Sequence, residues 1–344
     1  MTSEAPSNSR AMWGLFGVVV LLLIAALVWL LVGYNPFDVP EPERVTPVSV
    51  LIITGPGVGD RPVLDRPLGV TWGPRQDIYI SDTGNARVCV FDRRGRFLRE
   101  VGRVTTSTPA AQRSDALSQP AGLAVREDGL LFVADLRGGV VRVYDLKGKQ
   151  IRALKPPASK DGAPAQRWAP TDVAVSGDEV YVADAQGVAV FDVRGALKRR
   201  YDSVGGVAFE RPYSVDVASD GHVLVSDSLA QRVTSLTASG APTWTVPRPT
   251  GTQSFALPRG VAFASDGTAF VVDAFMFGFT HLSTKGATIE SYGNRGSKPG
   301  YFEFPNDVDV SDDLILVADK ENDRVQVVRV RGILNATTSD TRGE

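Results

Sequence analysis

Beyond residue 47 the chain alternates short apolar runs with turns rich in glycine and polar residues, a pattern typical of β-strands. One unit recurs six times: a proline opens an apolar strand, a short turn follows, and a second strand ends in aspartate. Successive units start 42–53 residues apart, close to the period of about 40–50 residues of propeller blades. The prolines are Pro67, Pro120, Pro170, Pro212, Pro258 and Pro305, and the aspartates are Asp82, Asp135, Asp184, Asp227, Asp273 and Asp319.

Each unit continues through a third strand and a glycine turn into a fourth strand, except the last, which ends in a polar segment after Gly332. The missing strand is present at the other end of the repeats, as PVSVLIITG from Pro47 to Gly55. Pairing this strand with the last blade would close the ring and remove an exposed β-edge. The pattern therefore predicts an all-β, six-bladed β-propeller of four-stranded blades over residues 47–332, with its N-terminal strand closing the last blade.

The segments ISDTGNARVCVFD and VADKENDRVQVV, in the first and sixth units, resemble the NHL repeat. GNRGSKPGYFEFP, between the fifth and sixth units, is similar to the glycine-punctuated segment that joins NHL blades. The middle units depart from the pattern: Gly138 replaces the asparagine, the third unit has a shortened hairpin, and the fifth carries AFMFGF. The resemblance implies a six-bladed propeller, a fold that hosts both binding proteins and enzymes.

Ahead of the propeller, residues 11–33 form an uncharged apolar stretch that favours a transmembrane helix. The 22 residues from Ala11 to Val32 would span about 33 Å as a helix, enough for the hydrocarbon core of a bilayer. A cleaved signal peptide is the alternative, but its apolar region is only about 7–15 residues long and precedes an A-x-A-like site that is missing here. Residues 1–10 then form a cytoplasmic tail, residues 34–46 a proline-rich linker and residues 333–344 a polar C-terminal tail.

Charge around the apolar stretch sets the predicted orientation. Arg10 precedes it, whereas Asp38, Glu41 and Glu43 follow it, so the positive-inside bias favours a cytoplasmic N-terminus. We therefore expect a single-pass protein of the cell membrane with an extracytoplasmic propeller. Since the linker reaches at most about 40 Å, the propeller should lie near the bilayer. Its closing strand starts on the face of the a–b and c–d turns, which predicts that this face is membrane-proximal and the b–c hairpin face membrane-distal.

Composition removes several classes of function. Lysine plus arginine total 37 and aspartate plus glutamate 39, so the chain lacks the basic surplus of proteins that bind nucleic acid through phosphates. The single cysteine, Cys89, excludes an intramolecular disulfide and cysteine-rich zinc sites. Only His222 and His281 are present, so a mechanism that needs three imidazoles is excluded.

The strand-ending aspartates recur at the same place in every blade, which favours a structural role in stabilising turns over a catalytic one. Arg87, Arg232 and Arg324 follow three of them by five residues and are placed to pair with them across the hairpin. Asp172 and Asp307 break the repeat, because they replace the glycine that follows Pro-x in three other blades. They should lie on opposite sides of the central channel and are candidate ligands for Ca²⁺, although no further ligands have recognisable spacing. Otherwise no cofactor is expected.

Whether the protein is an enzyme stays open. Amidating lyases that resemble NHL proteins use several histidines around a channel metal, more than this chain offers, and no G-x-S-x-G or H-E-x-x-H motif is present. Tyr213 and Arg259, near channel-side strand starts, are candidates for an acid or a clamp. The alternative function is therefore a metal-dependent propeller enzyme, a lyase or hydrolase with its site at the channel mouth.

The b–c hairpin of the fifth blade differs from the others, because it reads AFMFGF where they are polar or small. Its side chains are candidates for contact with a partner, since aromatic residues and methionine are enriched at interfaces. Inward packing between blades is the competing interpretation. The favoured function is a membrane-anchored, non-catalytic scaffold that binds a protein or ligand on the membrane-distal face, as a subunit or accessory of a membrane complex. The candidate contact residues are Phe275, Met276, Phe277 and Phe279.

Overall fold

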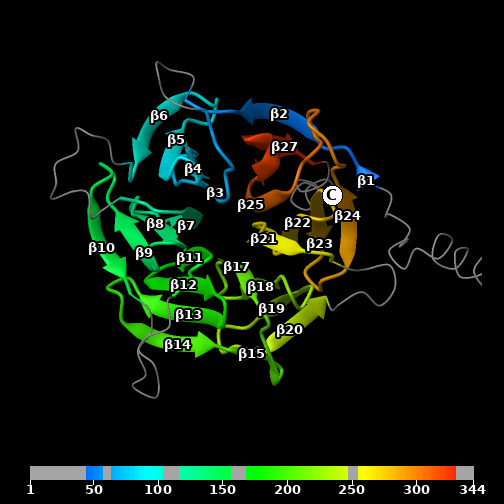
Figure 1. The fold of residues 1–344 in the computed structure, drawn as a ribbon. Helices are drawn as coiled ribbons and strands as arrows, with labels where there is room; N and C mark the ends of the chain where they lie inside the picture. The colour runs from blue at the N-terminus through cyan, green and yellow to red at the C-terminus, as the bar shows by residue number, and fades with distance from the viewer. Residues whose placement is uncertain (1–43, 57–62, 104–115, 156–167, 247–254, 331–344) are drawn as a thin grey trace, which may run out of the picture. The chain divides into compact units, whose positions relative to one another are not determined.

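The structure is a computed structural model that describes residues 44–56, 63–103, 116–155, 168–246 and 255–330. These residues belong to one compact unit, Glu43–Glu344, in which six small sheets surround a centre (Figure 1). The predicted membrane helix at 11–33, both tails and most of the linker lie outside the described residues. No helix within the described ranges is long and apolar enough to cross a membrane.

Each of the six blades has four antiparallel strands, and its first strand lies nearest the centre of the ring (Figure 1). We number the blades in chain order and call their strands a to d from the centre outwards. Blade five has a fifth, parallel strand at its outer edge, and blade six takes its outer strand from the N-terminal end of the ring. Blade one has β3 (Val70–Trp72), β4 (Ile78–Asp82), β5 (Arg87–Phe91) and β6 (Phe97–Val101), blade two has β7 (Pro120–Val125), β8 (Leu131–Asp135), β9 (Val140–Tyr144) and β10 (Gln150–Leu154), and blade three has β11 (Asp172–Ser176), β12 (Glu179–Asp184), β13 (Gly187–Asp192) and β14 (Leu197–Tyr201).

The second half of the ring repeats this arrangement, and one short hairpin, β15 (Ser203–Val204) with β16 (Val207–Ala208), connects blades three and four. The six-bladed all-β fold is therefore confirmed. Blade four has β17 (Pro212–Val217), β18 (Val223–Asp227), β19 (Arg232–Leu236) and β20 (Pro242–Val246), blade five has β21 (Pro258–Phe263), β22 (Ala269–Asp273), β23 (Gly278–Leu282) and β24 (Thr288–Tyr292), and blade six has β25 (Pro305–Ser311), β26 (Leu314–Asp319), the 3-10 turn η2 (Lys320–Asn322) and β27 (Arg324–Arg329).

The N-terminal strand closes the ring as the sequence predicts. β2 (Val48–Ile53) pairs antiparallel with β27, so it is the outer strand of blade six. The residues just before it make a second connection: β1 (Arg44–Val45) pairs in parallel with the end of β24 in blade five. Residues 44–53 therefore span the boundary between blades five and six.

The hydrophobic core consists of layers between neighbouring blades. In the layer between blades five and six, Phe279 stacks on Tyr292 with ring centroids 5.1 Å apart and meets Phe302 edge-on at 6.0 Å. Ile315 and Val317 of blade six complete this buried cluster. Because strand residues alternate between the two faces of a sheet, each middle strand contributes to the layers on both of its sides. Within the described residues, six buried clusters result, one between each pair of neighbouring blades.

The six strand-ending aspartates connect each blade to the loop that leads into it. Asp319, for example, accepts hydrogen bonds from the backbone N–H of Glu303, 16 residues upstream, and from the side chains of Asn322 and Arg324. Asp82 does the same in blade one, where it accepts from the Asp65 N–H and pairs with Arg87 at 2.6 Å. These are contacts expected of a structural carboxylate. Equivalent backbone N–H groups of the upstream loop donate to Asp135, Asp227 and Asp273, whereas Asp184 accepts from the indole N–H of Trp168.

Candidate functional site

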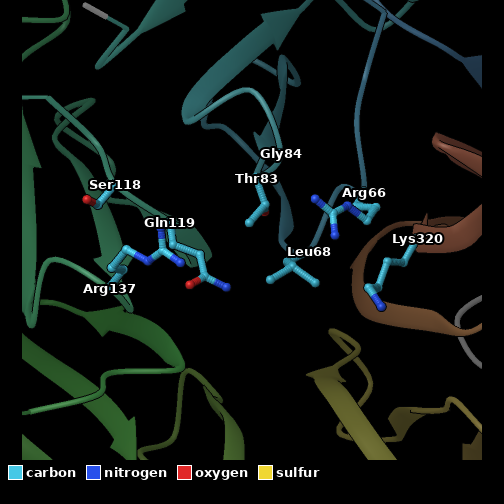
Figure 2. Close-up of a pocket in the computed structure, with 8 residues that line it drawn as sticks. All are labelled: Arg66, Leu68, Thr83, Gly84, Ser118, Gln119, Arg137 and Lys320. Atoms are coloured by element: carbon cyan, nitrogen blue, oxygen red, sulfur yellow. The ribbon is translucent and has the colours of Figure 1, made fainter.

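A pocket of about 300 Å³ lies on the face that carries the b–c hairpins (Figure 2). Residues from three blades line it, and they come from the b–c hairpins and from the loops that lead into the first strands. The chain therefore builds this pocket from segments as far apart in sequence as residues 66 and 320. The lining residues are Arg66, Leu68, Thr83, Gly84, Ser118, Gln119, Arg137 and Lys320.

The blade aspartates hold the loops of this pocket. Asp135 accepts hydrogen bonds from the backbone N–H groups of Ser118 and Gln119, which fixes the segment leading into blade two. The Thr83 hydroxyl donates to the carbonyl of Pro120 at 2.7 Å and so links the hairpin of blade one to the same segment. Buried carboxylates therefore place the pocket loops on a rigid ring, the arrangement that precise binding requires.

The pocket lining is positively charged, since Arg66, Arg137 and Lys320 approach it from three different blades (Figure 2). Arg66 pairs with the neighbouring Asp65 at 3.1 Å, and Lys320 pairs with Glu321. Ion pairs at an exposed surface contribute only about 0–1 kcal/mol, so a ligand that offers a better-placed anion can exchange with them. Thr83, Ser118 and Gln119 add polar groups for hydrogen bonding.

Beside the pocket, side chains from blades four, five and six meet at the mouth of the central channel. The Tyr213 hydroxyl donates to Asn306 Oδ1 at 2.9 Å, and Asn306 Nδ2 donates to the carbonyl of Leu68, which also lines the pocket. The Arg259 guanidinium lies 4.1 Å from the centroid of the Tyr213 ring. Tyr213 and Arg259, the candidates for an acid or a clamp, are thus engaged with each other, and burial raises the pKa of the tyrosine.

Deeper in the ring, Asp172 and Asp307 connect first strands of neighbouring blades. Asp172 accepts from the Val215 N–H at 3.0 Å, joining blades three and four, and Asp307 accepts from the Val70 N–H at 2.9 Å, joining blades six and one. Their glycine neighbours explain the break in the repeat, since a Cβ at Gly122 would lie 1.7 Å from an Asp172 oxygen. Each of these aspartates uses space that a glycine leaves open in the preceding blade.

Burial strongly affects both carboxyls. It raises the pKa of Asp172, and it raises the pKa of Asp307 well above its usual range, with a further contribution from the Asp172 charge. Among the residues that the structure describes, no group of three or more histidine, cysteine, aspartate or glutamate side chains is placed to hold a metal ion. A calcium site at Asp172 and Asp307 stays a prediction, and inter-blade hydrogen bonds already account for both residues.

The aromatic hairpin of blade five divides into an exposed and a buried part. Phe275 is 54% exposed at its tip, whereas Phe279 is only 1% exposed in the core. The prediction that Phe279 belongs to a contact surface is therefore wrong, because strand alternation turns its ring between the blades. Phe275 and Phe277 both meet Phe304 edge-on, at 6.0 and 5.2 Å. Met276 lies between them, partly buried.

Sequence reasoning missed the pocket residues. Arg66 and Gln119 directly precede the prolines that open blades one and two, and Lys320 and Arg137 follow strand-ending aspartates by one and two residues, but the residue types at these positions differ from blade to blade and form no motif. The available indication was topological: hairpins and inter-blade loops of adjacent blades meet on one face. Only ring closure through β2 brings blade six beside blade one, and that step was predictable.

The comparisons with known proteins agree with this geometry. The NHL repeat family model matches residues 64–91 and 302–328, which contain most of blade one and most of blade six. The chain contains NHL repeats. These are the two blades whose motifs resemble the repeat most clearly, and the ring places them side by side (Figure 1). In this NHL-repeat chain the intervening blades keep the same meander although their hairpins have diverged.

The relatives found by sequence are similar to this chain over only part of its length. Human NHL repeat-containing protein 2 is 32% identical over 103 residues, which is 28% of this chain and 14% of that protein. Protein SUPPRESSOR OF QUENCHING 1, chloroplastic, from Arabidopsis thaliana is 33% identical over 115 residues, 30% of this chain and 11% of that protein. The chain therefore spans a small fraction of each of these relatives.

Among solved structures, virginiamycin B lyase from Staphylococcus aureus is similar to this chain with a TM-score of 0.54. The match covers 77% of this chain and 80% of the lyase, at 13% sequence identity. At this level of identity the likeness concerns the fold alone. A propeller fold does not define an activity, so the function has to be argued from the residues of the site.

Proposed function

We propose that this protein is a non-catalytic binding propeller whose pocket at blades six, one and two holds an anionic group of a protein or small-molecule partner. The observation that carries this proposal is the approach of Arg66, Arg137 and Lys320 to one pocket. Arginine binds carboxylates and phosphates through two parallel N–H···O bonds, and lysine adds a point charge. Hydroxyl and amide groups of Thr83, Ser118 and Gln119 would orient the bound group.

The proposal includes attachment to the cell membrane through residues 11–33, with the propeller outside the cytoplasm. The length of the apolar stretch and the charges that flank it support this part. A rigid ring attached by a short linker would keep its binding pocket at a limited distance from the bilayer, a suitable arrangement for a subunit or accessory of a membrane complex. No nucleic acid partner is expected, given the charge balance.

A test of the pocket uses the full chain and two simple anions, citrate and inorganic phosphate, at constant ionic strength. A ligand that binds only the folded state raises its stability, by about 2.7 kcal/mol at 100 times Kd. We expect a concentration-dependent rise in Tm that is lost in the double variant Arg66→Gln with Arg137→Gln. The matched control is Arg93→Gln with Arg194→Gln, which removes two arginines from c–d turns on the other face.

The outcome separates specific binding from a general salt effect. Equal Tm shifts in the pocket variant, the control and the natural chain would show that the anions do not use this pocket. Crosslinking mass spectrometry on intact membranes then identifies the partner. Crosslinks near the pocket should disappear in the Arg66 and Arg137 variant while its Tm without ligand stays unchanged.

A further inference from the structure

Blade five and its neighbour expose apolar side chains at the tips of two adjacent b–c hairpins. Phe275 in blade five and Leu229 in blade four are both 54% exposed. Behind Phe275, Phe277 and Phe304 are in aromatic contact, and the Arg295 guanidinium lies 4.9 Å from the centroid of the Phe277 ring. We call Leu229, Phe275, Phe277 and Phe304 the apolar patch.

The N-terminal segment joins the propeller beside this patch. Arg44 donates a hydrogen bond to the carbonyl of Met276, which lies in the hairpin between Phe275 and Phe277. The backbone of Val45 accepts from the Gly293 N–H at 3.0 Å, and β1 pairs with the end of β24. The chain is therefore bound to blade five before it reaches β2, although β2 itself starts at the c–d turn side.

The short linker limits how far the patch can lie from a bilayer that holds residues 11–32. Eleven residues separate Val32 from Arg44, and fully extended they span at most about 35–40 Å. The part of the ring nearest to this attachment is the outer side of blade five. Blades one and two, which supply most of the pocket, lie across the ring from blades four and five (Figure 1).

Cationic side chains lie beside the patch. Arg44 binds the Met276 carbonyl, and Arg295 lies over the Phe277 ring and pairs with Glu303, so two cations lie beside the patch. Cations near apolar side chains suit a surface of anionic headgroups. On the opposite face the c–d turns carry cations such as Arg93, Lys147 and Arg194, but every a–b turn contains aspartate, which such a surface would repel. The aspartates of these turns are Asp77, Asp128, Asp178, Asp220, Asp266, and the pair Asp312 and Asp313.

The geometry points to the apolar patch as a second membrane contact, in which Phe275 and Leu229 insert into the interfacial region of the lipid bilayer. This inference rests on the membrane anchor of the proposed function, and it reverses the orientation expected from the start of β2. The ring would be tilted, with blades four and five against the lipid and the pocket of blades six, one and two turned towards solution. Aromatic and aliphatic side chains beside cations are typical of interfacial binding.

The test uses the full chain reconstituted in vesicles of phosphatidylcholine with phosphatidylglycerol. Single cysteines at Phe275→Cys and Leu229→Cys carry a nitroxide label, and Cys89 is fully buried, so labelling under native conditions is selective. Ser239→Cys and Lys147→Cys, in c–d turns, are the matched controls. Oxygen, which partitions into lipid, should relax the patch labels more than a water-soluble nickel chelate does, and the controls should show the opposite order.

Two substitutions at Phe275 test whether its side chain holds the patch in the lipid, with the label at Leu229 as the readout. Phe275→Asp should move the label at Leu229 into the aqueous phase, whereas Phe275→Trp should leave it in the lipid. Aqueous labels at both patch positions would overturn the inference and leave the patch for a protein partner, and deeper labels at the controls would restore the opposite orientation. Extraction of the chain from vesicles by alkaline carbonate tests the anchor separately, so failure of the anchor and failure of the patch are distinguishable.

Discussion

Buried carboxylates join the parts of this ring at the scale of single residues. The side chains of Arg87 and Asp82 have no exposed surface and form an ion pair at 2.6 Å. Arg87 also donates a hydrogen bond to Glu100, and Asp82 also accepts one from the Asn85 side chain. Removing one partner of such a pair leaves an uncompensated buried charge, which is why the pairs behave as structural elements. Recurrence of the aspartates predicted this role, but their reach to a loop 16 or 17 residues upstream could not be read from local spacing.

The inner carboxyls lead to a prediction about pH. Burial raises the pKa of Asp172 to about 7 and that of Asp307 well above its usual range, whereas an unfolded aspartate titrates near about 3.9. The folded state therefore favours the protonated acids. Their contribution to stability is fully present below about pH 4 and is lost as the pH rises through about 7.

Replacing Asp172 and Asp307 by asparagine removes this titration. We expect the double variant to lose less stability than the natural chain between pH 5 and pH 8, whatever its absolute stability. Urea unfolding across this range measures the difference, and Asp128→Asn, on an exposed a–b turn where the carboxylate pairs with Arg126, is the control with no such change. Parallel pH profiles for the variant and the natural chain would contradict the assignment of the raised pKa values.

At the scale of elements, the outer strand β2 closes the ring. Val48 pairs with Arg329 and Ile53 with Val325, and Ile53 is buried among residues of blades one and six. The alternation of apolar residues in PVSVLIITG and the incomplete sixth unit made this strand predictable. The strands β1, β15 and β16 were not, because two residues carry no periodicity and their pairing depends on tertiary contacts.

Truncation tests the closure. A chain that starts at residue 57 lacks both β1 and β2, so it exposes the edge of β27 and the apolar face beneath it. We expect it to aggregate or to melt well below a chain that starts at Glu43. Light scattering and Tm of the two purified chains give the comparison. If both chains were monomeric with the same Tm, the ring would not need this strand.

At the scale of the whole molecule, the binding surface depends on ring closure rather than on any single motif. Lys320 and Arg66 are far apart in sequence, and they reach one pocket because blade six lies beside blade one. The sequence predicted this adjacency and the face on which hairpins gather. It could not predict which loop side chains meet, because loop conformations depend on bonds such as that from Thr83 to Pro120.

The proposed orientation in the membrane leads to a labelling experiment on whole cells. With an N-terminus in the cytoplasm and an extracytoplasmic propeller, a membrane-impermeant maleimide should label Ser239→Cys in intact cells but Ser7→Cys only after permeabilisation. Cys89 is buried and adds no background in the folded protein. The reverse pattern would place the propeller in the cytoplasm, and a mature protein without residues 1–10 would indicate a cleaved signal peptide. Because the tilted ring requires an uncleaved anchor next to blade five, cleavage would also remove the constraint that holds the apolar patch close to the bilayer.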